Sequence, residues 1–135
     1  MLNDMLDVQA WHEAGYKSLV FSGEWRAAVL NDVQRFYREN INELQKHNTS
    51  DELFILLKGC CYLLIGEKDA NGSLKLTEVL LKPEVFYTIK KGVWHSHILE
   101  KGTSVAVIED KNVGPDNTEY MPINLSEFAL EKQGE

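Results

Sequence analysis

The chain has 135 residues and a formal net charge of -7 at pH 7, and 44% of its residues are hydrophobic and 26% are charged. This length suits one domain with a single hydrophobic core, and this composition excludes a disordered or fibrous chain. The acidic excess disfavours nucleic-acid binding, which needs a basic surface, and no apolar run approaches the ~20 residues that span a membrane. We therefore expect one domain over residues 1–135, with neither nucleic acid nor a membrane as its partner.

The amino terminus and the cysteines predict a cytoplasmic protein. The segment Met1–Ala10 contains Asp4 and Asp7 but no basic residue, unlike a secretory signal peptide. Cys60 and Cys61 are adjacent, and a disulfide between them would be strained because neighbouring residues of a strand point to opposite faces. We expect both cysteines to be small apolar side chains of a strand.

The first 15 residues predict a short N-terminal helix. Asp4 is a candidate N-cap, and Gly15 is a candidate end. Between them, apolar residues recur at near-helical spacing, namely Met5, Val8 and Trp11. At the other end of the chain, Ser126 is a candidate cap for a short terminal helix.

Between these two ends, short strand-like runs alternate with turn residues. The turns include Lys58-Gly59, the hairpin signal Asn71-Gly72 and Lys91-Gly92. Runs of this kind, spaced roughly 8–12 residues apart, are typical of a β-sandwich or a small barrel. The predicted fold is therefore all-β, a small antiparallel β-barrel with strands over Leu19–Phe21, Trp25–Leu30, Leu53–Leu57, Cys60–Ile65, Leu74–Leu81, Val85–Ile89, Val93–Leu99 and Val105–Ile108.

One predicted strand, Leu53–Leu57, is apolar at every position instead of alternating. A strand with this pattern is covered on both faces. A single small barrel covers only the inner face of such a strand, so its outer face needs a helix or a second subunit. We therefore predict a homodimer.

Five side chains able to bind a metal ion fall into two short segments. Gln45 and His47 are two residues apart, so in an extended strand they share one face, and Glu52 follows after a short turn. His95 and His97, far downstream, have the same spacing of two. Two imidazoles with one carboxylate form the ligand set of open iron and manganese sites. The segments together indicate a metal or ligand pocket.

The first segment resembles the first motif of the cupin superfamily. That motif reads His-x-His, three or four residues, Glu, six residues, Gly, and here the corresponding residues are Gln45, His47, Glu52 and Gly59. The second segment, Gly92-x2-His95, resembles the second cupin motif, Pro-x-Gly-x2-His. The resemblance covers residues 44–110. It implies an antiparallel barrel whose metal ligands are His47, Glu52 and His95.

The chain departs from the cupin motifs at several positions. Gln45 stands where the first histidine would be, and its amide oxygen is a weaker ligand than an imidazole. The other departures shape turns more than they supply ligands. They are Glu39 and Glu84 at two glycine positions, Lys90 at the proline and Leu99 at the final asparagine.

As a function, the resemblance implies a metal-binding cupin that acts on a small polar or anionic molecule. Its predicted metal ligands are Gln45, His47, Glu52 and His95, and its predicted cofactor is a divalent ion (Fe, Mn, Ni or Zn). The basic turn at Lys90-Lys91 is a candidate for attracting an anionic substrate.

Two other functions fit the same pocket. The tail from Asp116 to Phe128 is similar to the end of the nucleotide-sugar ketoisomerases, a metal-free cupin branch that uses histidine for proton transfer. In that case His47 or His95 is the general base of an isomerase or epimerase. The third function is a non-catalytic sensor of a small ligand.

Overall fold

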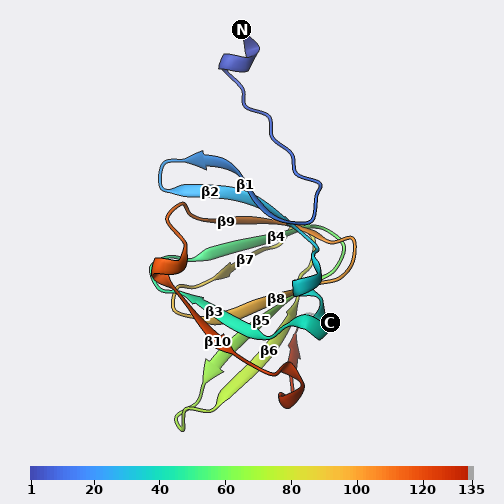
Figure 1. Ribbon diagram of the computed structural model, residues 1–135, viewed down its shortest axis with the longest axis vertical. Helices are drawn as coiled ribbons and strands as arrows, with labels where there is room; N and C mark the ends of the chain where they lie inside the picture. Colours follow the sequence, from blue (N-terminus) through green and yellow to red (C-terminus); the bar gives the residue numbers. More distant parts are fainter. Residues whose placement is uncertain (134–135) are drawn as a thin grey trace.

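The computed structural model describes residues 1–133, which form two β-sheets facing each other (Figure 1). The five-stranded sheet has the order β1 (Gly15–Ser22), β2 (Trp25–Asn31), β9 (Ser104–Asp110), β4 (Glu52–Lys58) and β7 (Phe86–Ile89). The six-stranded sheet has the order β10 (Thr118–Pro122), β3 (Glu43–His47), β8 (Trp94–Leu99), β5 (Cys61–Lys68), β6 (Leu74–Leu80) and β11 (Glu131–Gln133). The predicted all-β fold is confirmed.

The core lies between the two sheets and follows from alternation along the strands. Phe54 and Leu56 of β4 point inward and pack with Cys61 and Leu63 of β5. Cys61 is fully buried and Cys60 is half-buried, and both are free thiols. Among the described residues, all strand pairs are antiparallel except one, because β11 runs parallel to β6.

A smaller apolar cluster covers the outer face of the six-stranded sheet. Leu64 and Ile98 point outward there, and the C-terminal segment packs over them through Ile123, Leu125 and Leu130. The predicted terminal helix is replaced by a single 3-10 turn, η5 (Leu125–Glu127), followed by β11. The cap of this turn is Asn124, whose side chain accepts a hydrogen bond from the Ser126 amide, so Ser126 is not the cap.

The predicted N-terminal helix is wrong. Only one 3-10 turn, η1 (Leu2–Asp4), forms, and the chain then runs extended to Gly15, which begins β1 instead of ending a helix. Residues 1–10 are all exposed, so the apolar stripe has no surface of its own chain to pack on. A helix this short is marginal in water without such packing. No helix among the described residues is long and apolar enough to cross a membrane.

Gly59 lies in the turn between β4 and β5 and has a φ of +84°. Among the glycines of the described chain, it has the closest contact with the backbone of another segment. A Cβ at this position would lie 2.6 Å from the Thr103 Cα. Thr103 cannot move away easily, because its hydroxyl accepts a hydrogen bond from the Cys60 amide and donates one to the Cys60 carbonyl. The turn therefore requires glycine both for its backbone conformation and for its space.

We expect Gly59→Ala to lower the free energy of unfolding by about 3 kcal/mol, from left-handed strain plus overpacking. Gly72→Ala is the matched control, because Gly72 also has a positive φ (+81°) but an added Cβ would meet nothing within 4 Å. That control should cost about 1 kcal/mol. Urea unfolding of both variants measures the difference, and equal losses would contradict the close approach.

Candidate metal centre

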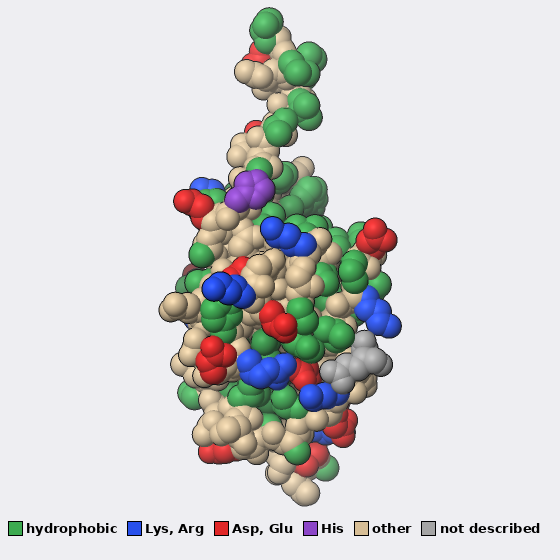
Figure 2. Space-filling view, turned by 90° about the vertical axis from the view of Figure 1, so that its right-hand side faces the viewer, with side chains coloured by type: hydrophobic (Ala, Val, Ile, Leu, Met, Phe, Trp, Pro, Cys, Tyr) green, Lys and Arg blue, Asp and Glu red, His purple; other side chains and the backbone are tan. Residues whose placement is uncertain are grey.

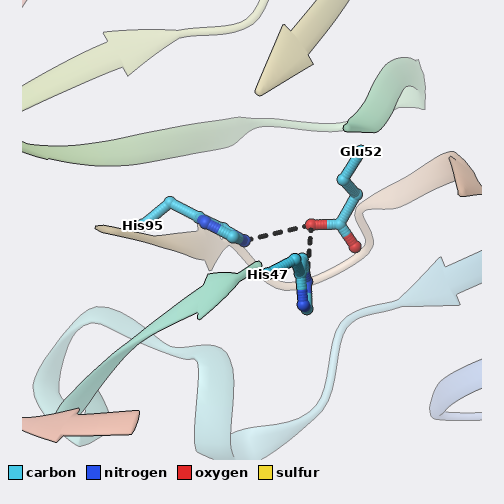
Figure 3. Close-up of side chains that lie close together, drawn as sticks. All are labelled: His47, Glu52 and His95. Atoms are coloured by element: carbon cyan, nitrogen blue, oxygen red, sulfur yellow. Dashed lines mark hydrogen bonds and ion pairs between the residues drawn. The ribbon is translucent and has the colours of Figure 1, made fainter. Parts of the chain in front are cut away.

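Three strands from both sheets bring the candidate side chains together (Figure 3). His47 is the last residue of β3, Glu52 is the first residue of β4, and His95 is the second residue of β8. All three residues are buried. The predicted meeting of two segments that lie far apart in the sequence is therefore found in the structure.

The turns that precede Glu52 and His95 are fastened to each other. The Gly92 amide donates to the His47 carbonyl at 2.7 Å, which ties the second motif directly to the first. The Asp51 carboxylate accepts from the Lys91 amide at 2.9 Å and lies 3.3 Å from the Lys90 Nζ. The hydrogen bond from Lys91 keeps the pKa of Asp51 below its ordinary value. These contacts fix the position of His95 relative to His47.

A single carboxylate oxygen lies next to both imidazoles. Glu52 Oε1 is 3.0 Å from His95 Nε2 and 3.4 Å from His47 Nε2, and one ligand atom from each residue lies within 4.8 Å of the others. Around an ion with bonds of about 2.1 Å, neighbouring ligand atoms are about 3.0 Å apart in octahedral and about 3.4 Å apart in tetrahedral geometry. The cluster is therefore compatible with a bound metal ion.

The outer nitrogen of each imidazole has its own partner. His95 Nδ1 lies 2.9 Å from the Val93 carbonyl oxygen, and because a carbonyl only accepts, this nitrogen carries a hydrogen. His47 Nδ1 lies 2.9 Å from Thr118 Oγ1. Such partners orient the rings of metal-binding histidines and leave Nε2 to face the ion. Both Nε2 atoms here face Glu52.

The electrostatics of the cluster favour a positive species between these groups. Burial alone would raise the pKa of Glu52, but the hydrogen bonds and charges of His47 and His95 outweigh it, and the pKa lies well below its ordinary value. Burial lowers the pKa of His47, yet the Glu52 carboxylate opposes this effect and the pKa of His47 is raised overall. Either a proton or a cation satisfies this arrangement.

A cavity of about 300 Å³ opens beside the cluster. Gln45 lines it together with His47 and Glu52, and the register pairs Gln45 with His95, so their side chains share one face. Three of the four predicted ligands therefore form the cluster, and Gln45 lies at the same cavity. The role of Gln45 as a ligand stays a prediction.

His97 shares the inner face with His95, as its spacing predicts, and also lines the cavity. Its ring lies 4.2 Å from the Phe36 ring and 5.6 Å from the Phe54 ring, measured between centroids. Both ring nitrogens are buried and have no hydrogen-bond partner among the described residues. Burial lowers the pKa of His97 to about 4, so the ring is neutral at pH 7. His97 can therefore both donate and accept a hydrogen bond inside the cavity.

A second polar group of the cavity wall escaped the sequence analysis. Glu109 of β9 accepts a hydrogen bond from the Tyr16 hydroxyl at 2.7 Å and pairs with Arg26 Nη2 at 3.2 Å. The register places Glu109 beside Glu52, and burial, followed by the charge of Glu52, raises the pKa of Glu109. The sequence did contain one clue to them. Arg26 and Glu109 are each a charged residue inside a strand that is otherwise mostly apolar.

The cations of the cavity are not the predicted ones. Lys90 is exposed and pairs with Asp51, and neither Lys90 nor Lys91 lines the cavity. Arg26 and Arg35 line it instead. The basic turn therefore has a structural role, because it fastens the two motif segments.

Comparison with known proteins finds similarity in structure alone. No family model matches the chain, and no curated protein is detectably similar in sequence. Solved structures do match, and all those named below are under 25% identical to this chain, so the likeness concerns the fold.

A cupin-2 domain containing protein from Shewanella frigidimarina NCIMB 400 is 20% identical, with a TM-score of 0.52 over 82% of this chain and 93% of that protein. HppE with Fe(II) is 16% identical, with a TM-score of 0.54 over 70% of this chain and 48% of HppE. A double mutant of the QdtA 3,4-ketoisomerase from Thermoanaerobacterium thermosaccharolyticum, in complex with TDP, is 19% identical, with a TM-score of 0.52 over 70% of this chain and 64% of QdtA. The chain thus spans less than two thirds of HppE and of QdtA. The two facing sheets, the motif spacing and these neighbours together establish that the protein has the cupin fold.

Proposed function

We propose that this protein is a metal-dependent cupin enzyme that acts on a small polar or anionic molecule. The observation that supports this proposal is the buried Glu52 oxygen between two Nε2 atoms, His95 at 3.0 Å and His47 at 3.4 Å. A buried carboxylate needs a positive partner, and the spacing suits a first-row divalent ion. The Fe(II) and Co(II) structures of HppE, a neighbour in fold, are consistent with such an ion.

In this proposal His47, Glu52 and His95 hold the ion, and Gln45 is a fourth or an outer ligand. Three protein ligands leave coordination positions open toward the cavity for substrate. When bound, the ion would act as a Lewis acid or as a template that orients the substrate. Thr118 and the Val93 carbonyl hold the two imidazoles in the orientation that binding needs.

The substrate class follows from the size and chemistry of the cavity. A volume of about 300 Å³ is at the small end for ligand pockets. Arg35 offers positive charge to an anionic group. Arg26 pairs with Glu109 through Nη2, but its Nε is buried without a hydrogen-bond partner in the described chain and is free to donate to a ligand. His97 offers a neutral donor and acceptor to a hydroxyl or carbonyl group. QdtA in complex with TDP and Streptomyces PAC13 with uridine support a small-molecule ligand in this fold.

The second candidate function is metal-free proton transfer by His47. It is favoured by the same contacts, because Glu52 and Thr118 flank the two nitrogens of His47 and could hold a proton there in place of an ion. The QdtA neighbour is a ketoisomerase by name, which agrees with this candidate. Metal binding separates the two functions.

We expect Mn²⁺, Fe²⁺, Ni²⁺ or Zn²⁺ to raise the melting temperature of the chelated protein. An ion at about 100 times its Kd stabilises the native state by about 2.7 kcal/mol through mass action. His47→Ala and His95→Ala should each abolish the rise, whereas Gln45→His should tighten binding by about tenfold, because imidazole is the better ligand. Differential scanning fluorimetry and calorimetric titration measure these effects.

His12→Ala is the matched control for these variants, because His12 is exposed and remote from the cluster in the sequence. It should retain the full metal-dependent rise. If no ion shifts the wild-type transition, the metal proposal fails and the histidine-base mechanism takes its place.

We expect His97→Phe to lower substrate turnover about tenfold or more while the metal-dependent rise in melting temperature stays unchanged. Phenylalanine keeps the packing against Phe36 but removes the two hydrogen-bonding nitrogens, and a ligand group left unpaired there costs about 1–3 kcal/mol. His97→Gln should recover part of the activity. Turnover is measured against a panel of sugar phosphates, nucleotides and small carboxylates.

Full turnover in His97→Phe would contradict the role of this ring in binding. The same panel separates an enzyme from a non-catalytic sensor. A sensor would show thermal shifts with a panel member but no product from the metal-loaded protein.

A further inference from the structure

The outer face of the five-stranded sheet is apolar and is not covered by the described chain. The strand register places its outward side chains in rows, and the outermost rows hold Trp25 with Asp110 at one end and Asn31 with Ser104 and Lys58 at the other. Between them lie two central rows, Val20–Ala27–Ile108–Leu53–Thr88 and Lys17–Val29–Ala106–Ile55–Phe86. Lys17, at the edge, is the one charged residue in these two central rows. No member of either row belongs to the two buried apolar clusters of the described residues. We refer to these two rows as the bare face.

The opposite sheet shows what a covered face looks like in this protein. There the outward Leu64 and Ile98 are fully buried, because the C-terminal segment packs over them. On the bare face, by contrast, Phe86 is 66% exposed. Leu57, two residues after Ile55 on β4, is 53% exposed. Within the described chain, the C-terminal segment thus covers the outer face of the six-stranded sheet, and no segment covers the outer face of the five-stranded sheet.

The N-terminal arm, residues 1–10, is the second apolar element that no other part of the described chain covers. It projects away from the barrel (Figure 1), and its apolar side chains stand clear of the body (Figure 2). Each of them is more than half exposed, namely Met1, Leu2, Met5, Leu6 and Val8. The arm is anchored at its base, where the side-chain amide of Asn31 donates to the backbone carbonyls of Trp11 and Glu13. It therefore starts beside β2, at the border of the bare face.

We propose that a second copy of this chain covers the bare face, with the two faces packed against each other and each arm laid along the partner. One chain carries both unpartnered apolar elements, so two copies related by a two-fold axis satisfy both at once. The two rows carry one charge, Lys17 at the sheet edge, and the charges of the flanking rows, Asp110 and Lys58, are of opposite sign, so two identical faces meet with little net repulsion. This interface does not depend on the proposed metal chemistry.

The dimensions of the two elements support their use together. Five strands about 4.8 Å apart and about 17 Å long present a face of about 400 Å². A stable interface buries about 800 Å² on each partner, so the bare face alone falls short. Ten extended residues reach about 33 Å, which exceeds the roughly 24 Å width of five strands. The arm is therefore long enough to cross the partner and supply the missing area.

Light scattering of the full chain at micromolar concentration should give twice the chain mass of 15.4 kDa. Phe86→Glu should weaken the dimer by about 100-fold or more, because it places an unpaired carboxylate in an apolar interface twice per dimer. Phe21→Glu is the matched control. Phe21 is 62% exposed on the same sheet, but its pairing with Arg26 places it on the cavity side, so this variant should remain dimeric.

Deletion of residues 2–10 should raise the dimer dissociation constant at least tenfold. A monomeric wild-type protein would overturn the proposal, and so would a dimer that Phe86→Glu and Phe21→Glu leave equally intact. A dimer that the deletion leaves unweakened would overturn the role of the arm. Circular dichroism confirms that each variant retains the β fold, so a loss of association is not a loss of folding.

Discussion

The site depends on the burial of one carboxylate. Glu52 is 7% exposed, and a charged carboxylate removed from water is costly unless positive groups or hydrogen bonds compensate. His47 and His95 face this carboxylate from two different strands, and each is itself oriented by a partner on its far nitrogen. Neutral imidazoles alone do not balance the charge, so the cluster calls for a proton or a metal ion.

The barrel holds the two histidines at fixed positions next to Glu52. The Gly92 amide bonded to the His47 carbonyl holds the two motif turns together, and the rest of the barrel supplies the packed core behind them. Strand β4 serves both sides of its sheet. Its inward side chains include Glu52 and Phe54, whereas its outward side chains, Leu53 and Ile55, lie on the bare face. The apolar residues at every position from Leu53 to Leu57 are explained by these two faces, because one face packs in the core and the other forms part of the bare face.

Much of this arrangement could be predicted from sequence, because motif spacing encodes turns and alternation. Glu84, at a motif glycine position, keeps a φ of +70°, so the motif's backbone survives the loss of its glycine. The place of Glu109 beside Glu52, and of Arg26 beside Glu109, could not be predicted, because it depends on the register between strands that are distant in the sequence. The prediction of an N-terminal helix was wrong because it also depended on packing. Residues 1–10 have helical spacing, but the described chain offers them no surface to pack on.

The most direct test of the metal site is a crystal structure of the protein soaked in Mn²⁺, with anomalous data. We expect one strong anomalous peak at about 2.0–2.3 Å from Glu52 Oε1 and the Nε2 atoms of His47 and His95. A map without a peak at this position, with His95 still in direct contact with Glu52, would show that the cluster does not bind a metal ion. The carboxylate would then be balanced by a proton, and the cavity would belong to a metal-free protein.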